Sequence, residues 1–172
     1  MTEHDSVILS RRVMKGFEPS IFDKLFDDSP VQASRRRLSM DEVKDAVARD
    51  LEALLNTRTV IDESLVSDFP RALASVASFG LNDFSGLSLA SVNDRRRICA
   101  SIERTIARHE PRLKEIEVGL ELDRRSINAL YFSIRAVLMV RPAQEPVSFD
   151  AMLQPTTLQY SIGRQRPRIG NA

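Results

Sequence analysis

The sequence has one cysteine, two histidines and no tryptophan among its 172 residues. The single thiol, Cys99, cannot form a disulfide within the chain, and its place on the apolar side of a helical pattern predicts a small core residue. His4 and His109 have no second histidine or cysteine at metal-ligand spacing, so the sequence predicts no metal site. His109 instead follows a helix, where a histidine interacts favourably with the helix dipole.

Glycine and long apolar runs are also scarce. The chain has six glycines and no phosphate-cradling motif, which argues against a nucleotide site, and we expect no cofactor. No apolar run approaches the roughly 20 residues that span a bilayer. Glu3, His4 and Asp5 stand where a signal peptide would be basic and then apolar. We therefore expect a cytoplasmic protein without direct membrane insertion.

Charge is nearly balanced, at a formal +1, but the basic residues are 21 arginines and only four lysines. A chain without a strong overall field is not drawn onto nucleic acid. The arginine runs at residues 35–37 and 95–97 have no interleaved aromatic residues, so solvated faces or protein contacts are expected there. Arginine is enriched in protein interfaces. We expect protein partners, and neither nucleic acid nor a small-molecule substrate.

Carboxylates offer one catalytic alternative. A glycosidase needs two carboxyl groups roughly 5 to 10 Å apart, one of them with a raised pKa. Glu110 is a candidate acid, but the nearby Arg112 would favour its ionised form. Glu115, Glu117 and Glu121 alternate along the wet face of a strand. Because tryptophan is also missing for sugar stacking, we expect no catalytic residues.

Helical periodicity is strongest over residues 40–56, where Ser39 and Glu42 form a capping box in front of an apolar stripe. A second long helix is capped by Ser91 and Asp94 and runs into Glu110. A short helix is predicted after Pro19, and another after Pro70, with Gly80 as a left-handed terminator and a packed loop over residues 81–90. The two long stripes are Val43, Ala46, Val47, Leu51, Leu54 and Leu55, then Val92, Ile98, Cys99, Ile102, Thr105 and Ile106.

Beyond Arg112 the apolar period changes from 3.6 to 2, which indicates strands. Residues 116–122 alternate between apolar and acidic or small residues, and residues 127–140 form a longer strand. Pro142 and Pro146 are expected to bracket a loop. A third strand is predicted around residues 147–153, and a fourth, at an edge, around residues 158–162.

Helices followed by a run of strands indicate the α+β class. We expect two long amphipathic helices plus short helices, packed on a mostly antiparallel sheet of about four strands. The predicted layout is a flexible arm over residues 1–17, a single domain over residues 18–163 and a mobile tail over residues 164–172. The tail holds three arginines and no acid.

The tripeptide Glu110-Pro111-Arg112 joins the second long helix to the first strand. Proline lacks a backbone N–H and pushes the preceding residue out of the helical region, so the helix must end at Glu110. The acid and the guanidinium can then each reach a separate neighbour, or form a partly buried pair with each other. We expect these charges to bind partners or to hold the joint.

Several segments together resemble a known family. Residues 50–58 (Asp-Leu-Glu-Ala-Leu-Leu-Asn-Thr-Arg) are similar to the helix signature of TssE, the small wedge subunit of the type VI secretion baseplate. Residues 69–81 resemble its middle segment. Residues 102–118, with their Glu-Pro-Arg block, are similar to the small baseplate wedge protein of contractile phage tails as well. The resemblance covers about residues 18–163.

The resemblance implies a cytoplasmic structural protein, assembled at the inner side of a membrane-anchored complex. Its implied partners are the wedge subunits TssF, TssG and TssK and the sheath proteins TssB and TssC, with the sheet accepting strands from the first sheath ring. An antiparallel sheet that follows two helices has an exposed edge, which can template strand addition. Two alternatives remain: a lysozyme-like peptidoglycan hydrolase, and an anti-adaptor that uses the same fold to block another protein.

Overall fold

The structure is a computed structural model, and it describes residues 16–19, 24, 37–59, 61, 68–73, 75–84, 86–88, 91–121, 129–154 and 156–164. The chain divides into two compact units, Met1–Val43 and Lys44–Ala172, which are treated separately. In the first unit, Phe17 and Leu38 form an antiparallel bridge with N–H to O distances of 2.9 and 2.8 Å. The second unit contains the sheet and most of the helical residues, so the predicted α+β class is confirmed.

Three α-helices lie in the described part of the chain, and two of them are long: α3, Met40–Asn56, and α6, Val92–His109. The capping box of α3 is present, because Glu42 N–H donates to Ser39 Oγ at 3.2 Å and Ser39 N–H donates to Glu42 Oε2 at 2.8 Å. The short α5, Pro70–Leu73, is followed by the 3-10 turn η1, Val76–Ser78. The short helix predicted after Pro19 falls almost entirely outside the described residues.

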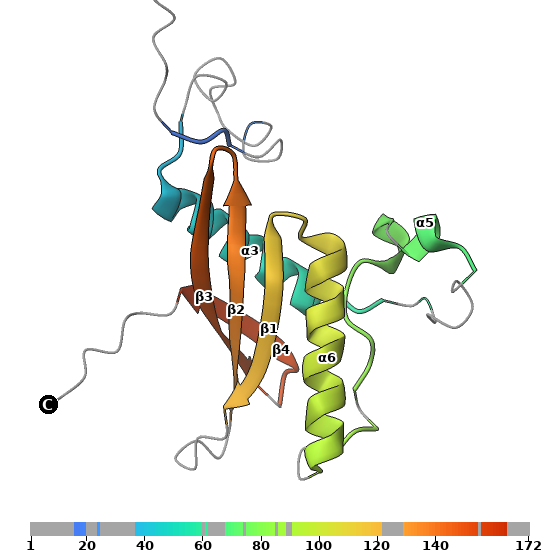
Figure 1. Cartoon of the computed structure of the whole chain (residues 1–172). Coiled ribbons are helices and arrows are strands. Elements are labelled where there is room, and N and C mark those ends of the chain that lie inside the picture. The colour runs from blue at the N-terminus through green and yellow to red at the C-terminus, as the bar shows by residue number, and fades with distance from the viewer. Residues whose placement is uncertain are drawn as a thin grey trace, which may run out of the picture. The chain divides into compact units, whose positions relative to one another are not determined.

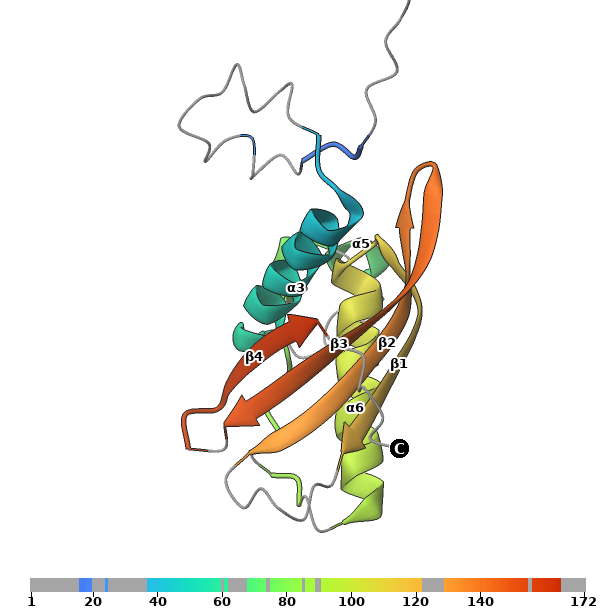
Figure 2. The same cartoon turned by 90° about the vertical axis from the view of Figure 1, so that its left-hand side faces the viewer.

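Four strands form one antiparallel sheet in the order β1-β2-β3-β4 (Figure 1). Their bounds are β1 Leu113–Glu121, β2 Leu130–Val140, β3 Ala143–Gln154 and β4 Gln159–Arg164. The fourth strand lies at an edge, as the sequence predicts. The sheet buries one face: β2 contributes Phe132 and Ile134, and β3 contributes Phe149. Helices α3 and α6 lie on that same side of the sheet (Figure 2).

The predicted loop between Pro142 and Pro146 is wrong. Arg141 and Pro142 make a tight turn, and β3 already begins at Ala143, so Pro146 lies inside the strand opposite Val137 of β2. A proline is tolerated within a strand when its missing N–H would point away from the neighbouring strand. The loop prediction failed because this part of β3 lies at an edge of the sheet, where a proline does not interrupt the pairing with β2.

A bulge changes the register of β1. Lys114 lies opposite Val137, but Glu117 lies opposite Arg135, so the first strand has one extra residue in this interval. Glu115 lies within the bulge and has a positive φ of 51°, in the left-handed region of backbone conformation. Leu113 and Val118 differ by an odd number of positions along the strand, yet both are buried. The bulge is what allows both side chains to reach the core, since regular alternation would turn one of them to solvent.

Gly80 has φ of 117°, as predicted for a left-handed terminator. A Cβ at this position would lie 2.7 Å from the Thr57 carbonyl oxygen. The close approach is required because Leu81 N–H donates to Thr57 O at 2.9 Å, while Thr59 N–H donates to Leu81 O at 3.0 Å. This backbone bridge ties the loop after η1 to the end of α3.

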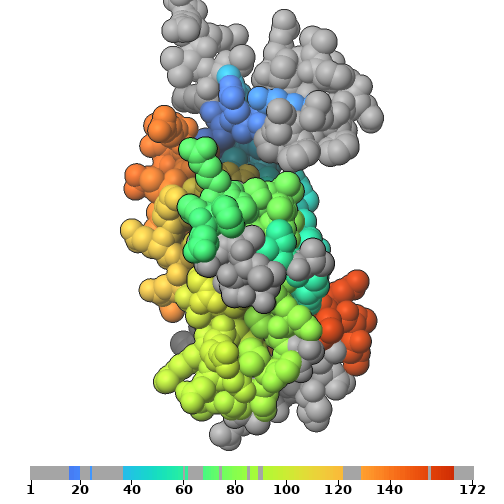
Figure 3. Space-filling model, turned by 90° about the vertical axis from the view of Figure 1, so that its right-hand side faces the viewer, coloured from blue at the N-terminus to red at the C-terminus, as the bar shows by residue number. Residues whose placement is uncertain are grey.

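Side chains of α6 and of the α5 segment lie at the surface of one face (Figure 3).

Candidate functional site

The Glu-Pro-Arg joint turns the chain from α6 into β1. Glu110 is the C-cap residue of α6, and its N–H donates to Ile106 O at 2.8 Å. Two residues beyond Pro111, Leu113 N–H donates to Glu110 O at 3.1 Å. The Glu110 backbone therefore satisfies both the last helical turn and the first residue of the strand, and the direction of the chain is fixed at this point.

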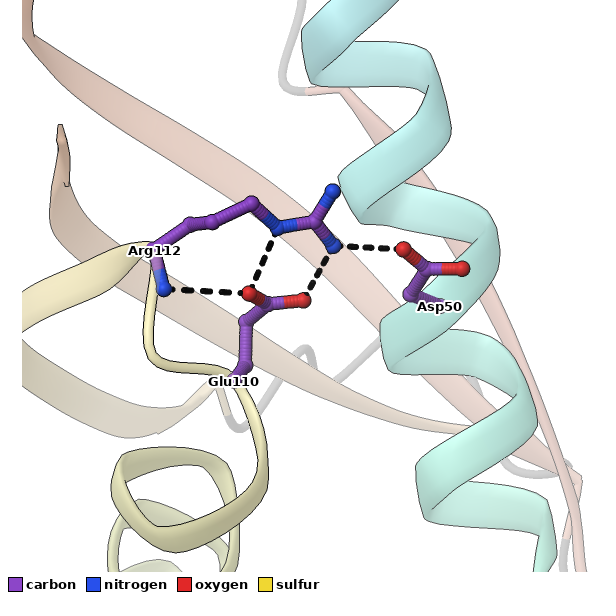
Figure 4. A network of polar contacts seen from close by, with 3 residues as sticks. All are labelled: Asp50, Glu110 and Arg112. Atoms are coloured by element: carbon purple, nitrogen blue, oxygen red, sulfur yellow. Dashed lines mark hydrogen bonds and ion pairs between the residues drawn. The ribbon is translucent and has the colours of Figure 1, made fainter. Parts of the chain in front are cut away.

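Glu110 and Arg112 form a clamp with Asp50 of α3 (Figure 4). Arg112 donates to Glu110 Oε1 from Nε at 2.7 Å and from its backbone N–H at 3.1 Å. Arg112 Nη2 contacts Glu110 Oε2 and also donates to Asp50 Oδ2 at 2.5 Å. We call these three residues the clamp. They connect the end of α6, the start of β1 and the middle of α3.

Burial differs across the clamp. The side chains of Glu110, Arg112 and Asp50 are 6%, 30% and 53% exposed. Hydrogen bonding to Glu110 is the largest cause that raises the pKa of Arg112, and burial opposes it. A charge-assisted, two-point contact between a guanidinium and a buried carboxylate is among the stronger polar interactions in proteins. Asp50, by contrast, presents an accessible carboxylate beside the pair.

The sequence predicted that the Glu-Pro-Arg charges bind partners or hold the joint. The geometry brings Glu110 and Arg112 together, whereas Pro111 stays exposed on the turn between them. Whether the clamp also contacts a partner stays a prediction. Asp50 was missed as its third member. It belongs to the signature block at residues 50–58, but nothing in the local pattern of α3 indicates a partner 62 residues away.

The other signature residues of α3 bind the outer edge of β4. Asn56 donates from Nδ2 to Tyr160 O at 2.9 Å, and Tyr160 N–H donates to Asn56 Oδ1 at 2.7 Å. Glu52 Oε2 accepts from Ile162 N–H at 2.8 Å. Just beyond the end of α3, Arg58 donates to the carbonyl oxygen of Leu158, the residue before β4, at 3.2 Å. These side chains occupy the positions that the backbone of a fifth strand would take. The Asn-Thr-Arg block thus contributes to an edge cap.

Side chains of helix α6 likewise bind backbone groups on the outer edge of β1. Glu103 Oε1 accepts from Val118 N–H at 2.8 Å. The Cys99 thiol lies within hydrogen-bonding reach of the Leu120 backbone, and its pKa is raised, chiefly by burial. Cys99 is half-buried in this contact. The sequence placed Cys99 on the apolar side of the helix but gave no indication that it faces a strand edge.

His109 connects the end of α6 to η1. Its Nε2 lies 3.0 Å from Ser78 O, and its ring packs edge-on against Phe79 with centroids 5.5 Å apart. Because a carbonyl only accepts, Nε2 carries the proton of the neutral ring. Burial is the largest cause that lowers the pKa of His109. Its role at the helix end is therefore that of a neutral donor, in place of the charged dipole partner that the sequence indicated.

A cavity of about 230 Å³ lies away from the clamp, between α6, the ends of β2 and β3, and the loop over residues 81–88. Its walls are mainly apolar, with Phe84, Leu130 and Leu153 among them, and Asp83 is the acidic residue among the described residues that line it. Two carboxylates would be needed for glycoside hydrolysis. Glu110, the candidate acid, is not among the lining residues and is engaged by Arg112.

Within the described residues, no three or more His, Cys, Asp or Glu side chains are grouped so as to hold a metal ion. Within the same ranges, no helix combines the length and the apolar character that a bilayer crossing requires.

The unit Lys44–Ala172 is thus a small α+β fold in which the charged Glu-Pro-Arg motif and Asp50 connect α6, β1 and α3. Comparison with protein families adds that the model described as baseplate wedge protein gp25 matches residues 41–143, which is more than half of the chain. The chain belongs to this baseplate wedge family, which supports a role in the baseplate of a phage tail or a type VI secretion system. The matched region includes α3 from its second residue onward, α6 and the whole clamp. No match to a curated protein was found.

Proposed function

We propose that the chain is the TssE-type wedge subunit of a type VI secretion baseplate, located in the cytoplasm. It would link the wedge subunits TssF, TssG and TssK to the first ring of the contractile sheath of TssB and TssC. The observation that carries this proposal is the family match over residues 41–143, combined with the signature residues of both long helices. A baseplate role requires a rigid small domain, and the clamp supplies rigidity where α6, β1 and α3 meet.

The clamp also provides a contact surface on α3. Asp50 is more than half exposed, and Arg112 shares its guanidinium between Glu110 and Asp50. A basic group of a wedge subunit can therefore approach Asp50 without disturbing the buried Glu110–Arg112 pair. Charged groups at a protein interface contribute more to the specificity of binding and the orientation of the partner than to the binding affinity.

The proposal includes no enzymatic activity. Glu110 accepts three hydrogen bonds from Arg112 and is buried, so its carboxylate is poorly placed to donate a proton to a substrate. The family, named for a baseplate component, supports a structural role.

Co-purification tests the proposal. Tagged full-length chain, expressed with TssF, TssG and TssK of the same organism, is expected to retain the wedge subunits through size-exclusion chromatography. The variant Asp50→Asn tests the contact surface and is expected to weaken capture while leaving the Glu110–Arg112 pair intact. The matched control is Asp41→Asn on the same helix. If wild-type chain captures none of the three subunits, the proposed function is wrong.

A further inference from the structure

The cavity beside the start of β4 has a buried floor and an exposed rim. Its floor includes three side chains that are at most 5% exposed: Ile98, Phe132 and Tyr160. Its rim includes three residues that are exposed: Arg58, Asp83 and Leu158. An apolar interior with a few fixed polar groups is the usual form of a binding pocket in proteins.

One polar group on the floor has no partner. Tyr160 is 3% exposed and Asn56 holds its backbone, but among the described residues nothing hydrogen-bonds to its hydroxyl group. The hydroxyl group is not sealed from solvent, and because the rest of the side chain is buried, its access is through the cavity that Tyr160 lines. A buried tyrosine hydroxyl group usually has a partner. The cavity is therefore where a partner for this group would lie.

The Tyr160 hydroxyl group stays neutral near pH 7. Burial is the largest cause that raises the pKa of Tyr160, to about 12, and the positive charge of Arg58 opposes it. A neutral hydroxyl group both donates and accepts a hydrogen bond. It can thus pair with another hydroxyl group that enters the cavity.

The size of the cavity fits one aromatic ring. Its volume is about 230 Å³, whereas an apolar cavity of about 150 Å³ in another protein binds benzene. The rings of Phe132 and Tyr160 have centroids 6.2 Å apart, so the floor is itself aromatic and favours a further ring. Water is held less well there, because a buried water needs about two to four polar partners and the walls are mainly apolar.

Leu158 extends the apolar surface beyond the cavity. Its φ of 55° is uncommon for a bulky residue. Its N–H donates to Gln154 O at 2.8 Å and its carbonyl oxygen accepts from Arg58 at 3.2 Å, so the backbone is held from both sides. The side chain is 55% exposed at the mouth. A small molecule inside the cavity would leave this leucine uncovered, whereas a protein segment that crosses the mouth would cover it.

Charges at the rim favour a neutral occupant. Arg58 and Asp83 carry opposite signs, so an anion or a cation would meet attraction and repulsion at the same mouth. Arg58 also already donates to the carbonyl oxygens of Leu55 and Leu158. The group that fits the floor, the hydroxyl group and the rim together is an uncharged aromatic ring with an oxygen at its end.

We infer that this cavity is the docking pocket for one tyrosine side chain of a partner protein, whose hydroxyl group pairs with that of Tyr160. The inference rests on the proposed function only for the identity of the partner, which would be a wedge subunit. Tyrosines that fill pockets are common anchors of protein interfaces. The Asn-Thr-Arg block then has a second role, because Asn56 fixes the backbone of Tyr160 and Arg58 that of Leu158.

Titration of the full-length chain with N-acetyl-tyrosinamide, followed by NMR, tests the pocket. The signals of Leu87, Leu153 and Leu158, which line the cavity, are expected to shift. N-acetyl-phenylalaninamide has the same ring without the hydroxyl group and should bind about tenfold more weakly, the loss of roughly one hydrogen bond. Equal affinity for the two amides would overturn the hydroxyl pairing, and no binding of either would overturn the pocket.

Two variants separate the hydroxyl group from the space. Tyr160→Phe keeps the ring and is expected to abolish the preference for the tyrosine amide. Tyr131→Phe, the matched control outside the lining residues, should keep that preference. Leu87→Trp places an indole in the cavity and should abolish binding of both amides, whereas Val76→Trp, at an 87% exposed position away from the cavity, should bind like the wild type. Retained preference in Tyr160→Phe would overturn the inference even if Leu87→Trp does not fold.

Two further measurements identify the occupant. Binding of free 4-methylphenol without binding of N-acetyl-tyrosinamide would show that the mouth excludes a polypeptide, which overturns the protein partner. In the co-purification with TssF, TssG and TssK, Leu87→Trp is expected to retain at least about fivefold less of the wedge subunits than Val76→Trp. Equal capture by both variants would overturn a wedge subunit as the partner. Failure of the wild-type chain to capture any subunit would overturn the proposed function, while the amide titration still decides the pocket.

Discussion

At the scale of single residues, the ion pair of the clamp is largely buried, whereas another ion pair of the chain is exposed. Glu110 and Arg112 form a two-point contact that is largely withdrawn from water, whereas Arg135 and Glu117 pair on the sheet surface at 3.3 Å with 67% and 72% of their side chains exposed. Buried pairs are costly to break one partner at a time, but exposed pairs contribute little. The two pairs offer a direct internal comparison.

Glu110→Ala is expected to lower the free energy of unfolding by about 3 kcal/mol, because Arg112 keeps only the exposed Asp50 as a partner. The double variant Glu110→Leu with Arg112→Met should recover most of that loss, since it removes both charges. Urea denaturation measures each value. Glu117→Ala on the surface pair, as the control, should change stability by less than about 1 kcal/mol. A Glu110→Ala effect as small as the control would contradict the clamp.

His109 gives a prediction for pH. Its pKa in the folded chain is lowered from the ordinary value of 6.5, chiefly by burial and further by Arg108. The unfolded chain therefore takes up the proton first as the pH falls. The stability that neutral His109 contributes is complete above about pH 6.5 and declines below it.

His109→Gln retains an N–H donor for Ser78 O but does not titrate. We expect the wild type to lose more unfolding free energy than this variant between pH 7 and pH 5, as measured by urea denaturation at both values. Identical pH dependence in the two proteins would show that His109 is not the titrating group.

At the scale of elements, the sequence predicted the helices best. The bounds of α3 and the caps of both long helices follow from local signals: a capping box, a Ser N-cap and a proline stop. Strand contacts depend on distant residues, and so the bulge at Glu115, the strand containing Pro146 and the two capped edges were not predicted. A polar residue on a helix, such as Glu52 or Asn56, looks solvated until the strand that it caps is known.

Asn56 allows a test of the β4 cap. Asn56→Ala removes both hydrogen bonds to the Tyr160 backbone, so amide exchange at Tyr160 should accelerate at least several-fold. Asn56→Asp keeps an acceptor for the Tyr160 N–H and should preserve much of its protection. Exchange at Val118, on the opposite edge, is the internal control. If Tyr160 exchanges at the same rate in Asn56→Ala and in the wild type, the cap has no energetic role.

At the scale of the whole molecule, the candidate site could be located from the sequence but its geometry could not. Glu110, Pro111 and Arg112 are adjacent in the chain, so the motif is visible. Asp50 joins them only through the packing of α3 beside the α6–β1 turn. Partner surfaces depend in the same way on which edges the fold leaves open, and no local pattern encodes that.

Zymography distinguishes a structural protein from a peptidoglycan hydrolase. Purified full-length chain is expected to give no lytic band on a gel that contains peptidoglycan, with hen egg-white lysozyme as the positive control. A clear band that disappears in Glu110→Gln would contradict the structural role, because it would show that Glu110 acts as an acid despite its contacts with Arg112.

Under the proposed function, sheath assembly depends on this chain as a structural part of the baseplate. The most direct measurement is the number of contractile sheaths per cell, counted by fluorescence microscopy of labelled TssB in the native organism. Deletion of the gene should abolish the sheaths, and the full-length chain should restore them. Sheaths that form at normal number without the chain would contradict the account.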